Sequence, residues 1–456
     1  MPYENNFVLT AADPLGPWSE PFYIQDADGI DPSLFFDVDG TCYYIGTHPN
    51  PGGCRYNGDW YIWIQELDLK EMQLVGERKD VWNGSQKDVI WPEGPHLYYK
   101  DGYYYIVHAE GGTGANHAVA VCRSKNIWGP YENNPCNPIL THRHLGKNHP
   151  VKYVGHADIV ETTGGEWYMV MLAIRPTDGY TTMGRETFLA KVIWEDGWPV
   201  VNPGVGMLTD KVEIQLPEWN IPSDETAYWN VSGKKNALPG SDRQYWFDQM
   251  RELGDEFLFL RNPTDDMYRL VEGVGLFLRP GQQNLRQKAS PSYICIRQQH
   301  HNFMVTAALS VTSLSTQNRK AGLALVQNNE YQLRMEVSKE SIEVILCEKG
   351  EDKLMGRMPL RKDLLLRGSE LELFLQVEAL KVSAGILHEG RFSIVEDLDI
   401  SSLSTEVAGG FVGCTVGIYA ALNESVPENE IEVFSDREGR EAYVCFRSFF
   451  YTVLRK

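Results

Sequence analysis

One hairpin pattern recurs three times in the first half of the chain, and it constrains the fold more than any other feature. In each copy a polar residue opens a short apolar strand, a Gly-containing turn follows, and an aromatic-rich strand returns. The copies begin around Asp31, at Glu93 and around His156, so the spacings are 62 and 63 residues. Repeats that bring the starts of their first strands to a common axis are typical of a β-propeller.

A second recurrence supports this interpretation. The segments LTAADPLGPWSEPFYI, from Leu9, and AVCRSKNIWGPYENNPCNPIL, from Ala120, share a strand, a polar turn, a Gly-Pro-aromatic triplet and an extended exit. Both are typical of the outer strands of a blade. No blade start precedes the first copy, so we expect the propeller to lack its N-terminal blade region. Unpaired edges and apolar faces would then favour association into a homo-oligomer.

The chain length of 456 residues predicts two domains, each large enough to bury a core. Short Val, Ile, Tyr and Trp runs alternate with turn residues up to about Val201, and no 3.6-residue period indicates a helix. Strong alternation returns in the second half, which predicts a lectin-like antiparallel β-sandwich. We therefore expect an all-β protein with a propeller at 1–215, a linker at 216–241 and a sandwich at 242–456.

Composition excludes several classes of partner. A net charge of −20 and a pI near 5.0 argue against nucleic acid. No apolar window is long enough to cross a bilayer, so we expect a soluble protein. The eight cysteines show no C-x-x-C pair, which disfavours zinc and redox sites and predicts mostly buried, reduced thiols. No signal peptide precedes Tyr3, but a segment upstream of Met1 could carry one. The sequence therefore does not determine the cellular compartment.

Glu93 is the candidate for acid chemistry. It lies in the run IWPEGPHLYYKDGYYYIVHAEGG, between two prolines and among aromatic rings. A carboxyl group beside apolar rings tends to stay protonated near neutral pH, as a general acid must. Trp91 lies two residues earlier, and on an extended segment it would share the face of Glu93 and line a sugar pocket. The alternative is that Glu93 only caps a turn.

Ten motifs occur in one order along nearly the whole chain: GIDPSLFFD, EGPHLYY, AEGGT, GPYE, NPILTHRHLG, GHADIVET, LAIRP, GRET, WEDGWPVV and SYICIRQQHHNF. With these motifs in this order, the chain resembles glycoside hydrolase family 43. The resemblance is to the branch of β-xylosidases and α-L-arabinofuranosidases that have a C-terminal concanavalin-A-like sandwich. The resemblance implies a five-bladed propeller. It also implies inverting hydrolysis of oligosaccharides or polysaccharides that contain xylose or arabinose, with no required cofactor.

The resemblance also implies three catalytic acids. Glu93 in PEGPH matches the general acid, and Asp31 in GIDPS matches the residue that modulates the pKa of the acid, although an Asp before a proline is also a common turn residue. The general base has no match in this chain, and we expect it upstream of Met1. Hydrolytic activity of this chain should therefore be impaired. The alternative is a non-catalytic carbohydrate-binding protein or a truncated gene product.

Three further matches are expected near the bound sugar or the central channel: Thr113, His156 and Arg185. His156 is either a core histidine or a channel residue that holds water or Ca²⁺. Arg185 either pairs with a carboxylate such as Glu186 or donates to sugar hydroxyls. The THRH run with His149 is interpreted as a loop, since it lacks recognised metal-ligand spacing.

The choice between xylosidase and arabinofuranosidase stays open. Family xylosidases often have an aromatic residue after the strand of the blade that begins around Asp31, whereas this chain has the sequence GTHPNP around His48.

Overall fold

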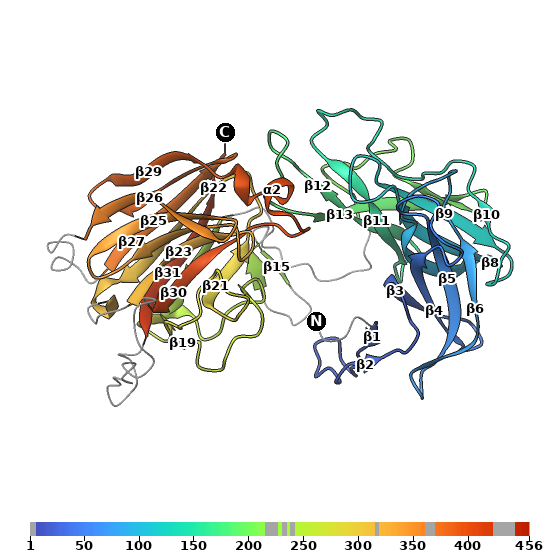
Figure 1. The fold of residues 1–456 in the computed structure, drawn as a ribbon, viewed down its shortest axis with the longest axis horizontal. Coiled ribbons are helices and arrows are strands. Elements are labelled where there is room, and N and C mark those ends of the chain that lie inside the picture. The colour runs from blue at the N-terminus through green and yellow to red at the C-terminus, as the bar shows by residue number, and fades with distance from the viewer. Residues whose placement is uncertain are drawn as a thin grey trace. The chain divides into compact units, whose positions relative to one another are not determined.

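The computed structural model describes residues 6–214, 242–314, 319–360, 370–422 and 443–455, together with the backbone of 227–229 and 235–237. The chain divides into two compact units (Figure 1). Unit 1 comprises Met1–Arg175 and Arg185–Asn220, and unit 2 comprises Pro176–Gly184 and Ile221–Lys456. The boundary at 220/221 falls within the expected linker 216–241, most of which lies outside the described residues.

The strands of unit 1 are β1 (Phe7–Val8), β2 (Phe22–Tyr23), β3 (Ile30–Phe36), β4 (Cys42–Pro49), β5 (Trp60–Asp68), β6 (Gln73–Trp82), β7 (Glu93–Lys100), β8 (Tyr103–Glu110), β9 (Ala118–Ser124), β10 (Glu132–Asn133), β11 (Lys152–Glu161), β12 (Trp167–Ile174), β13 (Glu186–Glu195) and β14 (Trp198–Val201).

These strands form three four-stranded antiparallel sheets, β3–β6, β7–β10 and β11–β14, and a two-stranded sheet β1–β2. Tight turns fix the hairpins. Asp101-Gly102 and Asp196-Gly197 have positive φ at both residues, as the type I′ hairpin turn requires. The predicted all-β propeller architecture is confirmed, with three complete blades in the described part of unit 1. The total of five blades stays a prediction.

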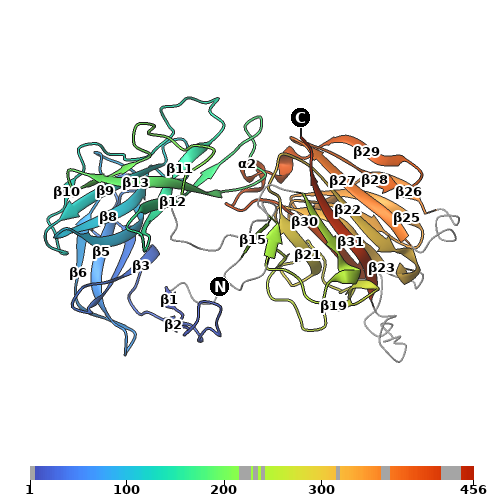
Figure 2. The ribbon, with the colours of Figure 1, turned by 180° about the vertical axis from the view of Figure 1, so that it is seen from behind.

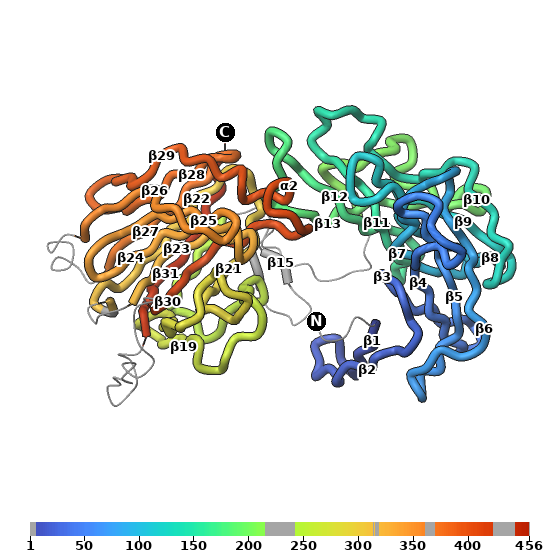
Figure 3. The backbone as a smooth tube through the Cα atoms, viewed as in Figure 1, coloured from blue at the N-terminus to red at the C-terminus, as the bar shows by residue number. Residues whose placement is uncertain are grey.

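Apolar side chains hold the three blades face to face. One cluster joins the first two blades and includes Ile62 and Ile106, and a second joins the last two and includes Val121 and Met169. This packing brings the first strands together, since β7 contacts both β3 and β11 (Figure 3). The starts of β3, β7 and β11 therefore meet.

The strands of unit 2 are β15 (Ala227–Trp229), β16 (Lys235–Ala237), β17 (Arg243–Trp246), β18 (Leu258–Phe259), β19 (Tyr268–Val271), β20 (Gly275–Leu278), β21 (Ser292–Arg297), β22 (Asn302–Ser310), β23 (Arg319–Val326), β24 (Gln332–Val337), β25 (Ser341–Glu348), β26 (Glu351–Pro359), β27 (Glu370–Glu378), β28 (Lys381–Leu387), β29 (Arg391–Asp399), β30 (Thr415–Leu422) and β31 (Val444–Val453). Its described helical segments are α2 (Thr405–Ala408) and the 3₁₀ turns Phe247–Gln249, Val311–Leu314 and Ser401–Leu403.

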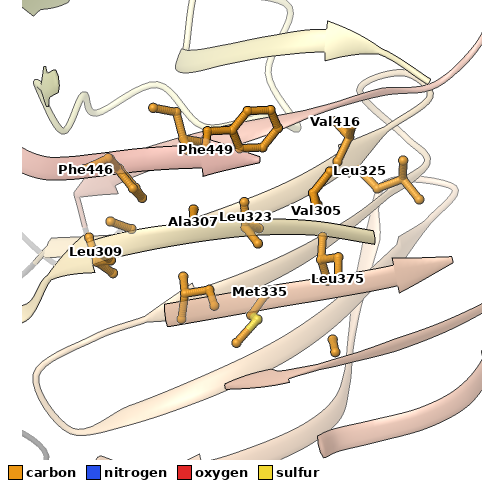
Figure 4. Packing of buried hydrophobic residues seen from close by; sticks show 14 of the residues in the cluster. Val305, Ala307, Leu309, Leu323, Leu325, Met335, Leu375, Val416, Phe446 and Phe449 are labelled. Atoms are coloured by element: carbon orange, nitrogen blue, oxygen red, sulfur yellow. The ribbon is translucent and has the colours of Figure 1, made fainter. Parts of the chain in front are cut away.

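Unit 2 is the predicted β-sandwich. One sheet has the order β19-β20-β31-β22-β27-β28-β29, with β17 also paired to β31, and the other has the order β18-β21-β30-β23-β24-β25-β26 (Figure 2). Alternate residues of each strand face the core. Val305, Leu323 and Phe449 meet there, as Figure 4 shows.

Unit 2 also contains Pro176–Gly184, the segment between β12 and β13. The backbone N–H and hydroxyl of Thr181 both donate to the carboxylate of Glu406, each at 2.7 Å. The backbone N–H of Cys414 donates to the carbonyl of Thr182 at 2.7 Å. The sequence pattern gave no sign that a propeller loop would pack within this unit.

All eight cysteines are unpaired and six are buried, as predicted. In the described part of the chain, no helix combines the length and apolar character needed to traverse a bilayer.

Candidate active site

The first strand of each complete blade begins with a β-bulge. The register with the neighbouring strand shifts around Asp31 in β3, around Gly94 in β7 and around His156 in β11. All three residues have positive φ, at 52°, 56° and 52°. A bulge re-aims the side chain that it carries, and positive φ in a non-glycine residue is a strained conformation. The strain at Asp31 and His156 therefore directs both side chains away from the regular pleat.

The positions of these bulges correct the alignment of the three sequence repeats. The sequence pattern equated Asp31 and His156 with Glu93, but the equivalent bulge residue is Gly94, and Glu93 precedes it by one position. The predicted alignment of the repeats was wrong by one residue, because it assumed a polar side chain at the start of every first strand. Gly94 has none, since a Cβ there would lie 2.6 Å from Nε2 of His156.

The structure brings together three of the predicted site residues. One carboxylate oxygen each of Asp31 and Glu93 and one ring nitrogen of His156 all lie within 4.8 Å of one another, and all three side chains are half-buried. The predicted convergence of the two acids from separate sheets is confirmed.

Arg185 lies just before β13, and its positive charge acts on both Glu93 and Asp31. Glu186, the other partner considered for Arg185, forms a bidentate ion pair with Arg175, at 3.0 Å from Nε and 2.6 Å from Nη2. The structure therefore associates Arg185 with the two acids.

The carboxyl of Glu93 is difficult to ionise. Burial is the largest cause, the negative charge of Asp31 adds to it and Arg185 opposes it, and together they raise the pKa of Glu93 from 4.5 to about 7. Near neutral pH a large fraction of Glu93 is protonated and can donate a proton. Asp31 and Glu93 lie closer than the roughly 6.5–9.5 Å that separates the acid and base of an inverting pair. Asp31 therefore lies too close to Glu93 to be the base of an inverting pair.

One histidine, His156, lies beside the two acids, and a second, His117, lies near His156 and Arg185. Burial lowers the pKa of His156, although the charge of Asp31 acts in the opposite direction. Burial also lowers the pKa of His117 to about 4, so this ring is neutral at physiological pH. Its Nδ1 hydrogen-bonds the carbonyl of Tyr153 at 2.9 Å, and the ring packs directly on Gly155. No sequence pattern marks His117, whose ring supports the bulge that carries His156 by packing on Gly155.

Trp91 does not lie on an extended segment. Its φ is 48°, so the expectation that it shares a strand face with Glu93 was wrong. Its backbone N–H donates to the carbonyl of Gly58 at 2.8 Å, and its ring lies against Gly58 and Gly112, where a Cβ would collide with it. Thr113 is half-buried and directly follows Gly112. The loop between β8 and β9, which carries Thr113, therefore packs on the ring of Trp91 through Gly112.

The donor set fits Ca²⁺ poorly as a resident ion. Calcium takes six to eight oxygen ligands. The group formed by Asp31, Glu93 and His156 offers two carboxylates and one nitrogen, and burial disfavours the ionised form of Glu93.

The THRH run is structural, as expected. Nδ1 of His142 hydrogen-bonds the carbonyl of Val151, and its Nε2 accepts from the backbone N–H of Leu208, both at 2.9 Å. Nδ1 of His149 contacts the same carbonyl at 2.8 Å. His142 therefore has no ring nitrogen left for a metal ion.

His48, where the sequence departs from the family pattern, is also buried. Its Nε2 lies 2.8 Å from the carboxylate of Asp80, and its Nδ1 lies 3.5 Å from that of Asp28. Two carboxylates thus hold this ring in place of an aromatic residue.

Comparisons with known proteins agree with this fold. Residues 2–199 match the profile of the glycosyl hydrolases family 43, and residues 245–433 match the β-xylosidase C-terminal concanavalin A-like domain. A xylosidase/arabinosidase of Butyrivibrio fibrisolvens is 47% identical over 440 residues, which cover 93% of this chain and 79% of the relative. A non-reducing end α-L-arabinofuranosidase of Bacteroides ovatus is 32% identical over 434 residues, covering 93% of this chain and 74% of the relative.

Solved structures give the same result. A family 43 protein from Bacillus licheniformis has a TM-score of 0.79 at 30% identity, and the match covers 98% of this chain and 79% of that one. A xylan β-1,4-xylosidase from Bacillus halodurans also has a TM-score of 0.79, at 28% identity, with 98% and 81% covered. The chain therefore belongs to glycoside hydrolase family 43, whose members hydrolyse O-glycosyl bonds, and it combines a propeller-type domain with a concanavalin-A-like sandwich.

Proposed function

We propose that this chain carries the acid centre of an exo-acting, inverting glycosidase that releases terminal β-xylose or α-L-arabinofuranose. The observation that carries the proposal is the carboxyl of Glu93, half-buried beside Asp31 with its pKa raised to about 7. The relatives named xylosidase/arabinosidase and α-L-arabinofuranosidase support the substrate class.

Each residue of the site has a chemical role in this proposal. Glu93 protonates the departing glycosidic oxygen, and the negative charge of Asp31 keeps Glu93 protonated until the substrate binds. Arg185 and His156 donate to sugar hydroxyls, while Trp91 and Thr113 form the wall beside the acid. No bound metal or cofactor takes part.

The chain by itself is expected to hydrolyse slowly. None of the residues assigned to this site acts as a general base, because Glu93 and Asp31 already have the roles of acid and modulator. A missing proton acceptor for the attacking water lowers the rate by roughly 10²- to 10⁴-fold.

Pentose preference is assigned to the loop between β4 and β5. Gly58 in this loop lies against Trp91, and Asp59 anchors the loop through Arg55, whose Nη2 lies 2.8 Å from the Asp59 carboxylate. The shape of this loop decides which pentose fits beside the indole.

The test is the hydrolysis of xylobiose, nitrophenyl β-xyloside and nitrophenyl α-L-arabinofuranoside by the purified chain and by its Glu93→Gln variant. We expect slow turnover of all three substrates, with the α-anomer of xylose as the first product of a β-xyloside in proton NMR. Turnover of xylobiose should fall further in the variant, because its leaving group needs the proton of Glu93, and xylobiose turnover that does not depend on Glu93 would contradict the acid assignment. A β-anomer would indicate retention, with Asp31 as nucleophile.

A second candidate function follows because none of the assigned site residues acts as a general base. In this case the chain binds carbohydrate without cleaving it. Calorimetry that shows pentose binding without turnover, and unchanged by Glu93→Gln, would support the binding protein over the hydrolase.

A further inference from the structure

Two hydroxyl groups reach from the first complete blade to the strand of Glu93. Oγ1 of Thr47 donates to the carbonyl of Pro92 at 2.6 Å, and Oγ of Ser33 donates to the carbonyl of Pro95 at 2.7 Å. Pro92 directly precedes Glu93, and Pro95 follows it by two residues. The two accepting carbonyls therefore bracket the acid.

The donor ends of these hydrogen bonds bracket Asp31 in the same way. Ser33 follows Asp31 by two residues in β3, and Thr47 in β4 pairs with Ile30, the residue before Asp31. Thr47 is fully buried, and the backbone of Gly29 packs so tightly on its carbonyl that no Cβ could fit between them. Each hydroxyl thus links a neighbour of one acid to a neighbour of the other.

The bulge in β7 explains why one of these acceptors is available. The ladder with β8 pairs Glu93 with Ala109 and resumes at His96, so Pro95 has no partner residue in the register. A buried carbonyl without a partner is costly, and the Ser33 hydroxyl satisfies this one.

The two acids repel each other whenever both are ionised, and a half-buried site screens that repulsion poorly. A rigid link between their strands is therefore needed to keep them close. We propose that Ser33 and Thr47 are positioning residues that hold the carboxyls of Asp31 and Glu93 at their short separation against this repulsion. The inference rests on the proposed function, which assigns these carboxyls as modulator and acid.

Loss of the links has a predictable electrostatic consequence. The strands of Asp31 and Glu93 can then move apart, and water can enter between them. Both changes favour the ionised form of Glu93, so its pKa falls. The Glu93 carboxyl itself is the readout, and its titration needs no substrate.

The experiment is a ¹³C NMR titration of the full chain labelled at the glutamate side-chain carboxyl carbons. The Glu93 signal is identified by its loss in Glu93→Gln. In the Ser33→Ala/Thr47→Val double variant we expect the Glu93 pKa to fall by about 0.5 to 1 unit. Thr47→Ser keeps the hydroxyl and should titrate like the wild type.

A matched control removes a similar bond elsewhere. Ser292 is buried in unit 2, and its hydroxyl donates to the carbonyl of Arg279 at 2.5 Å. Ser292→Ala should lose comparable stability and leave the Glu93 titration unchanged. If Thr47→Val fails to fold, the half-buried Ser33→Ala alone provides the test, with a smaller shift in the same direction.

Two results would overturn the inference. One is a wild-type Glu93 titration in the double variant. The other is a pKa decrease of equal size when the double variant is made in an Asp31→Asn background, since the hydroxyls would then act on solvent access alone. A chain that titrates as expected but hydrolyses no pentoside contradicts the proposed function and leaves the positioning role intact.

Discussion

Glu93 carries a carboxyl whose ionised form the fold disfavours, and this makes chain stability depend on pH. Because its folded-state pKa of about 7 lies above the ordinary 4.5, Glu93 contributes stability that is fully present below 4.5 and lost as pH rises through 7. The difference corresponds to at most about 3 kcal/mol, and partial exposure reduces it.

Glu93→Gln should therefore stabilise unit 1 at pH 8.5 and have little effect at pH 4.5, where wild-type Glu93 is already neutral. Urea unfolding of both proteins at the two pH values measures this. A stability difference between the proteins that does not change with pH would contradict the raised pKa.

Gly94 is required at its bulge for two reasons that reinforce each other. Its φ is 56°, and a Cβ would collide with the ring of His156. Gly94→Ala should cost about 2 to 4 kcal/mol of unfolding free energy, from backbone strain and displacement of the ring. Gly40→Ala is the matched control, since Gly40 has positive φ with open space around it and should cost less. Equal losses in the two variants would show that the contact with His156 contributes nothing.

At the scale of elements, the loop between β6 and β7 determines how Glu93 enters its strand. Glu110, at the end of β8, accepts from both the backbone N–H and the hydroxyl of Ser85 in this loop. Burial alone would raise the pKa of Glu110, but His108 and Ser85 lower it, so its carboxylate stays charged.

Glu110→Gln should destabilise the loop by about 1 to 3 kcal/mol, because the amide cannot accept both bonds. Hydrogen exchange of the Ser85 amide should accelerate accordingly. The exposed Glu132, whose carboxylate lies 2.6 Å from Nε of Arg123, is the control, and Glu132→Gln should change stability by less than about 1 kcal/mol. Unchanged exchange at Ser85 in Glu110→Gln would contradict the anchoring role.

Much of the element arrangement could be predicted from sequence, because alternating strands with Gly and Asp turns specify hairpins locally. The meeting of Asp31 and Glu93 followed from the repeat. The bulge register could not be predicted, since the apolar pattern does not show which residue at a strand start is left unpaired. Neither could the roles of Ser33, Thr47 and His117, whose partners are backbone carbonyls of other strands.

At the scale of the whole molecule, the family resemblance identified both units and their fold classes. It did not indicate that Pro176–Gly184 packs within unit 2, because contacts of Thr181 with Glu406 depend on tertiary packing alone.

The predicted association of the chain into a homo-oligomer has structural support in unit 1, where Val160 and Val170 on neighbouring strands are 53% and 38% exposed. Sedimentation should show a dimer or larger species that Val160→Lys disperses, and a wild-type monomer would contradict this.

Proton donation by Glu93 can be measured with a series of aryl β-xylosides whose leaving groups increase in pKa. Loss of the acid should hardly affect substrates whose leaving group departs without a proton, and should slow those that need one. We predict that kcat/KM of Glu93→Gln relative to wild type falls progressively along the series. An equal decrease for every leaving group would show that Glu93 does not act as the general acid.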